Sequence, residues 1–249
     1  MEPLVASVAM FVRASVPSPL GLALGGPAAL AWAWLCLRLA AYLKRSRGWR
    51  TGYTRKVFHF LIFGTVVVVH TAWGLPAVCI VGGATTLVVF YAVIGGNGHP
   101  LYEAIAREKD APRRAYYVVA PYFATLIGGL ASAILFPATA VFGFLVAGLG
   151  DAVGEPVGTW LGRHTYRVPA FWGVPSARSI EGSTAVFLAC LAAIGAGLAL
   201  GHRAPLSPQR ALAIPLLAAV CTLIEAVSPH GWDNATLQIV ASCLAGWML

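Results

Sequence analysis

Charged side chains are scarce in this sequence. Asp, Glu, Lys and Arg make up only 10% of its 249 residues, whereas 59% of the residues are hydrophobic. Soluble globular domains carry about 25% charged residues. Acidic residues are the rarer charged class, with nine Asp and Glu against 17 Lys and Arg. This composition excludes a water-soluble globular domain and indicates a protein whose surface faces lipid.

Several motifs of soluble and secreted proteins are also absent. The first fifteen residues lack the basic start and the small-residue cleavage site of a secretory signal, so we interpret residues 1–24 as a retained amphipathic or partial helix. The sequence contains no Gly-x-x-x-x-Gly-Lys-[Ser/Thr] phosphate loop. Its cysteines lie in apolar runs without Cys-x-x-Cys spacing, which indicates neither a zinc site nor a disulfide framework: Cys36, Cys79, Cys190, Cys221 and Cys243.

Long apolar blocks fill most of the chain. A membrane-spanning helix needs about 20 mostly apolar residues, because the hydrocarbon offers no water to its backbone. We predict an all-α polytopic membrane helix bundle of about seven or eight spans, one domain over residues 25–249, with the N-terminus outside or interfacial. The eighth block, Thr236 to Leu249, is short. The seven longer blocks are Gly25 to Leu43, Val57 to Trp73, Leu75 to Ile94, Tyr116 to Phe136, Thr139 to Gly158, Ser183 to Leu200 and Ala211 to Val227.

Basic residues are concentrated in alternate loops. Lys and Arg in short loops mark the cytoplasmic side of a membrane protein. Because they lie in loops rather than on one polar face, they do not indicate nucleic-acid binding. We predict a multi-pass protein whose polar motifs face the cytoplasm. Thirteen of the 17 basic residues follow the first, third and fifth spans: Lys44, Arg45, Arg47, Arg50, Arg55, Lys56, Arg107, Lys109, Arg113, Arg114, Arg163, Arg167 and Arg178.

Two carboxylates lie in the fifth apolar block. Asp151 and Glu155 are four residues apart, so both face one side of a helix. An acidic side chain at membrane depth costs about 2.5 to 3.5 kcal/mol on insertion scales, and it therefore lines a cavity or has a partner. Mg2+ is bound by few carboxylates together with substrate phosphate oxygens, and we predict such a site here. A pair of helix-end carboxylates in the interface is the alternative.

A possible phosphate-binding segment precedes the sixth apolar block. Residues 178–183 read Arg-Ser-Ile-Glu-Gly-Ser, and Gly162 and Arg163 lie upstream. A helix N-terminus presents unpaired amides and a positive dipole end. Ser179 can cap this helix, and the fork of Arg178 can grip a phosphate. A capping segment that binds no ligand is the alternative.

Polar residues also mark two other span ends. Arg55 and Lys56 can share a helix face with His59, which lies about one turn inside an apolar block and needs a polar partner there. Anchoring by basic residues accounts equally well for Arg55 and Lys56. Glu225 lies inside the seventh block, and the pair Asp233-Asn234 can cap the last helix.

Together these segments resemble the polyprenol, dolichol and phytol kinases, a family of CTP-dependent lipid alcohol kinases related to the CDP-diacylglycerol synthases. Residues 54–59 resemble the family's Arg-Lys-x-x-His block. Residues 150–154, Gly-Asp-Ala-Val-Gly, resemble its Gly-Asp-Ala-x-Ala block, which the spaced glycines Gly158 and Gly162 follow. Residues 178–183 resemble its Lys-Ser-x-Glu-Gly-Ser block, and residues 225–234 its final Glu and Asp-Asn block.

The resemblance implies a membrane enzyme that transfers the terminal phosphate of a nucleoside triphosphate, typically CTP, to the hydroxyl of a lipid alcohol. It implies Mg2+ as cofactor, with Asp151, Glu155 and Glu181 as metal ligands, and Asp151, His59 and Glu181 as catalytic residues. Glu225, Asp233 and Asn234 are further candidates. The residues expected at the nucleotide phosphates are Arg55, Lys56, Gly158, Gly162, Arg163, Arg178, Ser179, Gly182 and Ser183.

Two other functions are compatible with the same residues. One is a CDP-diacylglycerol-type cytidylyltransferase, although the His-Gly-Gly run and the Asp-Arg-x-x-Asp run of that family are absent. The other is an ion or proton-coupled transporter that uses the buried acids as its path. The halves of the chain show no similarity that would indicate inverted repeats. The sequence leaves the lipid alcohol, the choice of CTP over ATP and the oligomeric state open.

Overall fold

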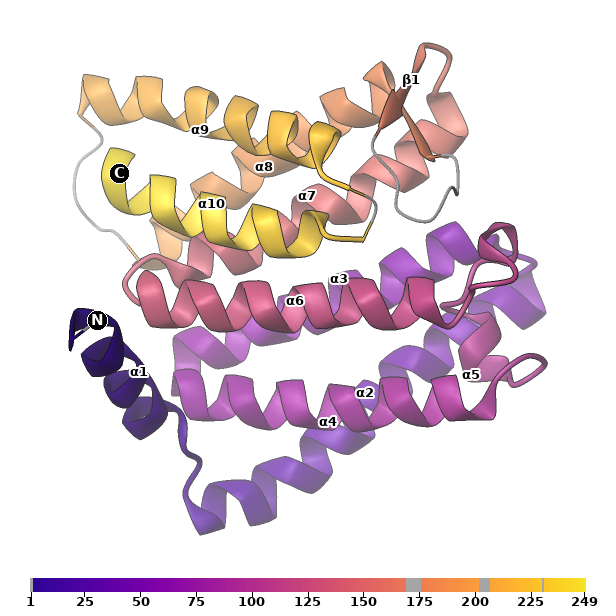
Figure 1. Ribbon diagram of the computed structural model, residues 1–249, viewed down its shortest axis with the longest axis horizontal. Coiled ribbons are helices and arrows are strands. Elements are labelled where there is room, and N and C mark those ends of the chain that lie inside the picture. Colours follow the sequence, from indigo (N-terminus) through magenta and orange to yellow (C-terminus); the bar gives the residue numbers. More distant parts are fainter. Residues whose placement is uncertain (1, 169–175, 202–206, 230) are drawn as a thin grey trace. The chain divides into compact units, whose positions relative to one another are not determined.

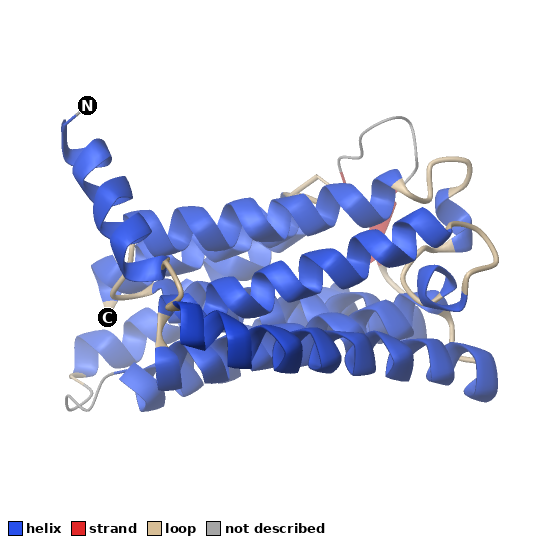
Figure 2. Ribbon diagram, turned by 90° about the horizontal axis from the view of Figure 1, so that it is seen from below, coloured by secondary structure: helices blue, strands red, loops and turns tan. Residues whose placement is uncertain are grey.

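Helices dominate the fold (Figures 1 and 2). The computed structural model describes residues 2–168, 176–201, 207–229 and 231–249, which divide into two compact units, 1–118 and 119–249. The elements are α1 (Glu2–Ser15), α2 (Pro19–Arg47), α3 (Thr51–Trp73), α4 (Leu75–Gly95), α5 (Pro100–Glu103), the 3-10 turn η1 (Glu108–Asp110), α6 (Tyr116–Leu135), α7 (Ala140–Leu161), β1 (Thr165–Val168), β2 (Ser176–Ser179), α8 (Ile180–Gly201), α9 (Pro208–Val227) and α10 (Asp233–Met248).

The predicted membrane fold is confirmed. Among the described residues, seven helices are long and apolar enough to cross a membrane, namely α2, α3, α4, α6, α7, α8 and α9. They coincide with the seven apolar blocks of the sequence to within a few residues at most ends. The short eighth block forms α10, which has 16 residues. The chain is therefore an all-α, multi-pass membrane protein.

In the first unit, α2, α3 and α4 pack against one another. The buried face of α2 consists of small and aliphatic side chains, including Ala33, Leu37 and Ala40, while Leu35 and Leu39 on its other face are exposed. This division is expected of a membrane helix, because lipid tails solvate leucine as well as the protein interior does. The helix ends at Gly48, whose φ of 66° is the left-handed conformation of a C-cap.

Ion pairs hold the segment between α4 and α6 in place. Arg114 donates from Nη2 to Oε2 of Glu103 at 2.7 Å and from Nη1 to Oδ1 of Asn97 at 2.7 Å. Arg107 and Asp110 form a buried pair at 2.9 Å. Because each acid in this segment has a basic partner, the segment has a defined fold despite its high content of charge.

The pair formed by Glu103 and Arg114 predicts a pH dependence. The hydrogen bond from Arg114 lowers the pKa of Glu103 below its ordinary value, more than burial raises it. A lowered carboxyl pKa stabilises the fold above the ordinary pKa, and this stabilisation is lost as pH falls through the lowered value. The protection of residues 97–115 from hydrogen exchange, corrected for the intrinsic pH dependence of exchange, is expected to fall on acidification in the native protein but much less in Glu103→Gln. An identical acid response in the two proteins would contradict this role of the pair.

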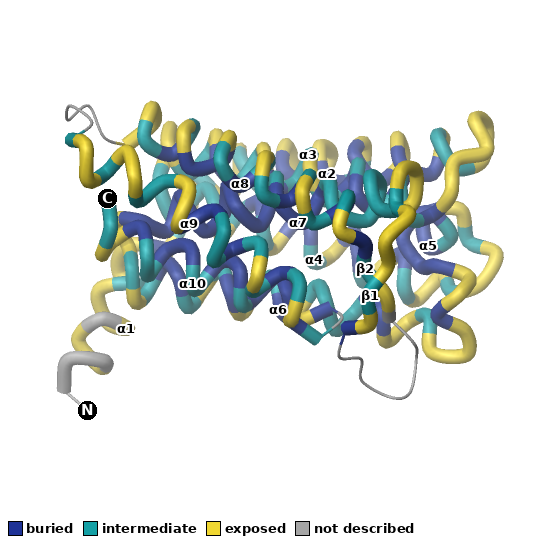
Figure 3. The backbone as a smooth tube through the Cα atoms, turned by 90° about the horizontal axis from the view of Figure 1, so that it is seen from above, coloured by how far each residue is buried: buried dark blue, intermediate teal, exposed yellow. Residues whose placement is uncertain are grey.

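In the second unit, α7 is the central helix. Of its apolar window, 61% is buried, against 17–33% in the other six candidate spans, and it contacts α8, α9 and α10. Figure 3 shows the buried backbone along α7. Small residues let α8 approach closely, as is common between membrane helices: a Cβ at Gly154 would lie 2.9 Å from Cγ2 of Val186. Pro156 does not end the helix, which continues to Leu161.

Helix α10 packs against α6 through a polar seam. Gln238 is buried and donates from Nε2 to the backbone oxygens of Thr125 and Asn234, at 3.0 and 2.8 Å. Asn234 donates from Nδ2 to Oγ1 of Thr125 at 3.0 Å. Opposite this seam Gly128 has no side chain, which leaves room for the backbone of Ala235.

Gly128→Ala is therefore expected to destabilise the protein, because the new Cβ would lie 2.7 Å from Cα of Ala235. Overpacking of this kind costs about 1–3 kcal/mol. Gly195→Ala in α8 is the matched control, since a Cβ there meets no atom within 4 Å. Thermal unfolding in detergent measures both variants. A melting temperature that falls no further for Gly128→Ala than for Gly195→Ala would refute the close contact.

Candidate functional site

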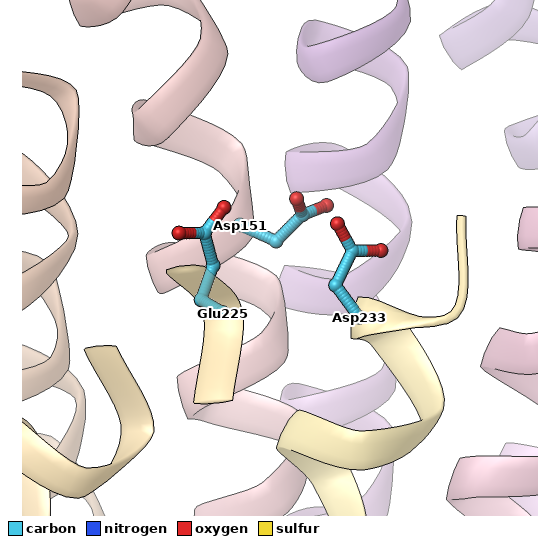
Figure 4. Close-up of side chains that lie close together, drawn as sticks. All are labelled: Asp151, Glu225 and Asp233. Atoms are coloured by element: carbon cyan, nitrogen blue, oxygen red, sulfur yellow. The ribbon is translucent and has the colours of Figure 1, made fainter. Parts of the chain in front are cut away.

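Three buried carboxylates converge in the second unit. Asp151 lies on α7, Glu225 near the end of α9, and Asp233 at the first residue of α10. One ligand oxygen from each lies within 4.8 Å of the others, and the three residues are only 7%, 6% and 8% exposed. Figure 4 shows the three carboxylates gathered in one place. We call these three residues the acidic centre.

Arg178 of β2 is a basic partner of the acidic centre. Its Nε lies 3.2 Å from Oε1 of Glu225, and its Nη2 donates to Oδ2 of Asp233 at 3.0 Å. Two of the three guanidinium nitrogens are thus occupied, while Nη1 is buried and has no hydrogen-bond partner among the described residues. Burying like charges together is unfavourable unless cations offset them. Arg178 supplies one such cation to Glu225 and Asp233.

Local structure brings Arg178 to this position. Strands β1 and β2 pair antiparallel with Tyr166 opposite Arg178, and α8 begins directly after β2. The predicted cap is confirmed, because Ser179 accepts a hydrogen bond from the backbone N–H of Gly182 at 3.1 Å. The hydroxyls of Tyr166 and Ser183 lie 2.6 Å apart and join the hairpin to the first turn of α8. Arg178 is thus fixed by a hairpin on one side and a capped helix on the other.

The oxygen donors of the acidic centre fit a divalent cation. Mg2+ prefers oxygen ligands and is usually held by one or two carboxylates, retaining waters or substrate oxygens for its other positions. Asp151, Glu225 and Asp233 would hold such an ion, which when bound neutralises negative charge on phosphate oxygens. The convergence of three buried carboxylates at one place favours this interpretation over three independent helix-end acids.

The predicted metal ligands are brought together only in part. Asp151 belongs to the acidic centre, and Glu225 and Asp233, which the sequence offered only as further candidates, complete it. Glu155 is half-buried on α7 and lies outside this group. Glu181 lies outside it as well, since Oε1 of Glu181 is 2.8 Å from Nδ1 of the exposed His164. The metal roles of Glu155 and Glu181 stay predictions.

The glycines expected at the phosphates lie where α7 meets the start of α8. A Cβ at Gly158 would be 3.0 Å from Oγ of Ser179, and one at Gly182 would be 2.8 Å from the backbone oxygen of Gly154. Gly162 also approaches Ser179, and Arg163 is exposed. These glycines therefore have a packing role, and their predicted contact with a nucleotide stays a prediction.

The basic block of α3 belongs to the first unit. Lys56 is buried, Arg55 and His59 are half-buried, and the ring of His59 lies against that of Phe63 with centroids 4.5 Å apart. An aromatic ring is thus one of the neighbours of His59. The predicted roles of these three residues in catalysis and phosphate binding stay predictions.

Two residues that support the acidic centre were not identified from the sequence. Gln238 and Thr125 hold Asn234, the neighbour of Asp233, through the hydrogen bonds of the α6–α10 seam. The backbone N–H of Asn234 in turn donates to Oδ1 of Asp233 at 3.0 Å. The sequence feature that could have indicated them is the spacing of Asn234 and Gln238. These two polar residues are four positions apart, on one helix face of an otherwise apolar block. These contacts make Asn234 a positioning residue for Asp233.

The fold and this site define the class of the protein: a multi-pass helical membrane protein with a buried acidic centre and an arginine partner. Comparisons of the chain with known protein families, with curated proteins and with solved structures found no match.

Proposed function

We propose that the protein is a membrane kinase that transfers the terminal phosphate of a nucleoside triphosphate to the hydroxyl of a lipid alcohol. The observation that carries the proposal is the acidic centre with Arg178. Its members come from three blocks separated in sequence, residues 150–154, 178–183 and 225–234, and the resemblance to the lipid alcohol kinases rests on those same blocks. The resemblance favours CTP as donor and a polyprenol, dolichol or phytol as acceptor, with the active-site loops on the cytoplasmic side.

The chemistry needs few reacting groups from the protein. The alcohol oxygen forms a bond to the terminal phosphorus, the bond from that phosphorus to the bridging oxygen breaks, and the nucleoside diphosphate leaves. Catalysis of this transfer consists mainly of positioning and of neutralising charge on the phosphate oxygens. The centre would hold Mg2+, and of the two candidates Asp151 and His59 we propose Asp151, a member of the centre, as the group that accepts the proton of the alcohol.

Arg178 is suited to the phosphate side of this reaction. Its Nε and Nη2 are anchored on Glu225 and Asp233, whereas Nη1 remains available to donate to a ligand. A guanidinium that is held in this way loses little further conformational freedom when it binds an oxyanion. This geometry supports a nucleotide site more than a cation-transport path, since a fixed guanidinium beside the carboxylates offers a donor to phosphate oxygens and none to a cation.

The test is phosphorylation by the purified protein in detergent, with CTP or ATP labelled on the terminal phosphate, Mg2+ and a panel of lipid alcohols. We expect labelled lipid phosphate and release of CDP. With phosphatidic acid added as a further substrate, release of pyrophosphate and formation of CDP-diacylglycerol would instead identify a cytidylyltransferase. Cation uptake into vesicles without any nucleotide turnover would identify a transporter, and either result would overturn the proposal.

A further inference from the structure

The net charge of the chain is confined to one unit. Residues 1–118 contain twelve of the 17 Lys and Arg but only four of the nine Asp and Glu, so this unit accounts for the whole formal charge of +8. The remaining residues hold five basic and five acidic side chains. Selection for membrane orientation explains why basic residues occur in loops, but it does not specify where in the folded unit they lie.

Ion pairs with acidic residues of the same unit neutralise part of this basic charge. Lys44 pairs with Glu108, and both contact Thr51. Arg107 pairs with Asp110 and Arg114 with Glu103. Lys56 is buried and Arg55 has a partner within the protein. Lys44, Arg107 and Arg114 are therefore engaged in ion pairs within the unit.

Four other arginines remain at the end of α2 and in the turn that follows it. Arg38, Arg45, Arg47 and Arg50 are exposed, and their side chains form no ion pair or hydrogen bond with another described residue. Three of them lie within six residues of chain, at positions 45, 47 and 50. Such a cluster just beyond a membrane span repels itself unless anions gather around it.

The exposed face of α2 leads from apolar to basic side chains. Arg38, Tyr42 and Arg45 follow the i, i+4, i+7 spacing of one helix face. Tyr42 is 52% exposed, the exposed Leu39 lies next to Arg38, and the exposed Leu35 lies about one turn nearer the membrane interior, while the opposite face is buried in the unit. Arg38 and Arg45 are about 10 Å apart along the helix. Lipid tails would therefore contact the apolar residues of this face, and lipid headgroups would contact its basic residues.

Beyond the helix, Trp49 stands in the turn between Arg47 and Arg50 and is 44% exposed. Tyr and Trp concentrate at the level of the headgroups, where one part of the ring is in hydrocarbon and the polar part is hydrated. The left-handed Gly48 reverses the chain at this point, so Trp49 and Arg50 follow directly after the last helical turn. The aromatic residues thus favour headgroup depth for Arg45, Arg47 and Arg50, and the long side chain of Arg38, which starts about 10 Å deeper along α2 than Arg45, can extend toward the same level.

From these observations we infer that the surface formed by Arg38, Tyr42, Arg45, Arg47, Trp49 and Arg50 binds the headgroup of an anionic phospholipid. The arginines offer forks that match phosphate oxygens, Tyr42 and Trp49 contact the glycerol region, and Leu35 and Leu39 contact the acyl chains. The binding is to a phospholipid of the surrounding bilayer and is independent of the acidic centre in the other unit.

The test uses the purified full chain in a neutral detergent and fluorescent phosphatidylglycerol, with binding read by anisotropy. Unlabelled phosphatidylglycerol is expected to compete and phosphatidylcholine to compete poorly. Arg45→Gln and Arg47→Gln are each expected to weaken binding about fivefold, the effect of removing about 1 kcal/mol of attraction per basic residue. Arg45→Lys keeps the charge but loses the fork, so it should weaken binding less than Arg45→Gln does. Arg13→Gln, an exposed arginine on α1, is the matched control with no expected effect.

Three results would overturn the inference. The first is equal competition by phosphatidylcholine. The second is unchanged binding in the Arg45→Gln and Arg47→Gln variants, or an equal loss in Arg13→Gln. The third is displacement by inorganic phosphate or CTP at the concentrations at which phosphatidylglycerol competes, because the surface would then bind a soluble phosphate rather than a lipid.

Discussion

Asp151→Asn is expected to abolish lipid phosphorylation. The substitution keeps the size of the side chain of a residue that is only 7% exposed. It removes one of the three converging charges. Removing one preorganised electrostatic group from an active site typically lowers turnover by about 10²–10³-fold. Turnover of CTP with a lipid alcohol measures the effect. Near-normal phosphorylation would remove Asp151 from the site.

A second readout separates loss of the metal from loss of the fold. An ion that binds only the folded protein raises its melting temperature. Mg2+ is therefore expected to stabilise the native chain in detergent and to lose that effect in Asp151→Asn, Glu225→Gln and Asp233→Asn. Glu155→Gln discriminates between the two sets of ligands, because Glu155 is predicted from the sequence alone but lies outside the acidic centre. A larger loss of Mg2+ stabilisation in Glu155→Gln than in Glu225→Gln would favour the sequence-based set.

Arg178→Ala is expected to have the largest effect on stability of any single substitution at the site. It leaves Glu225 and Asp233 without the guanidinium that lies 3.2 and 3.0 Å from their carboxylates. Removing one partner of a buried ion pair costs about 3–5 kcal/mol, because an uncompensated charge stays buried. Denaturation in mixed micelles measures the free energy of unfolding.

The matched test is rescue by neutralising the acids. If the unpaired charges cause the loss, Arg178→Ala combined with Glu225→Gln and Asp233→Asn should recover much of the stability, although not the activity. Arg178→Lys keeps one charge but loses the fork, and it should fall between the native chain and Arg178→Ala. A triple variant as unstable as Arg178→Ala alone would show that the arginine acts through packing rather than charge.

Much of the secondary structure follows from the sequence by local rules. Each of the seven spans is a stretch of apolar residues long enough to cross a bilayer, so length and composition alone predict it. The cap of α8 is equally local, because Ser179 needs only the N–H of Gly182, three residues away. The effect of Pro156 was harder to predict, since whether proline bends or ends a helix depends on what packs around it.

Such local rules could not predict the acidic centre. Helical periodicity relates Asp151 to Glu155, four residues away on the same face, and this led to the predicted pairing of those two acids. It carries no information about residues 225 and 233, which reach Asp151 only because α9 and α10 pack against α7. The likeness of separated blocks to one family indicated that they belong together, but not which oxygens meet.

The sequence by itself determined that this is a membrane protein. Its scarcity of charge and its seven apolar blocks leave no other solvent for the folded chain. Only the tertiary structure decided which of the rare charges act together, because partners in a low-dielectric interior are selected by helix packing across long sequence separations. It brought Glu225 and Asp233 to Asp151 and placed Arg178 between them, and it left four arginines of α2 and its following turn exposed.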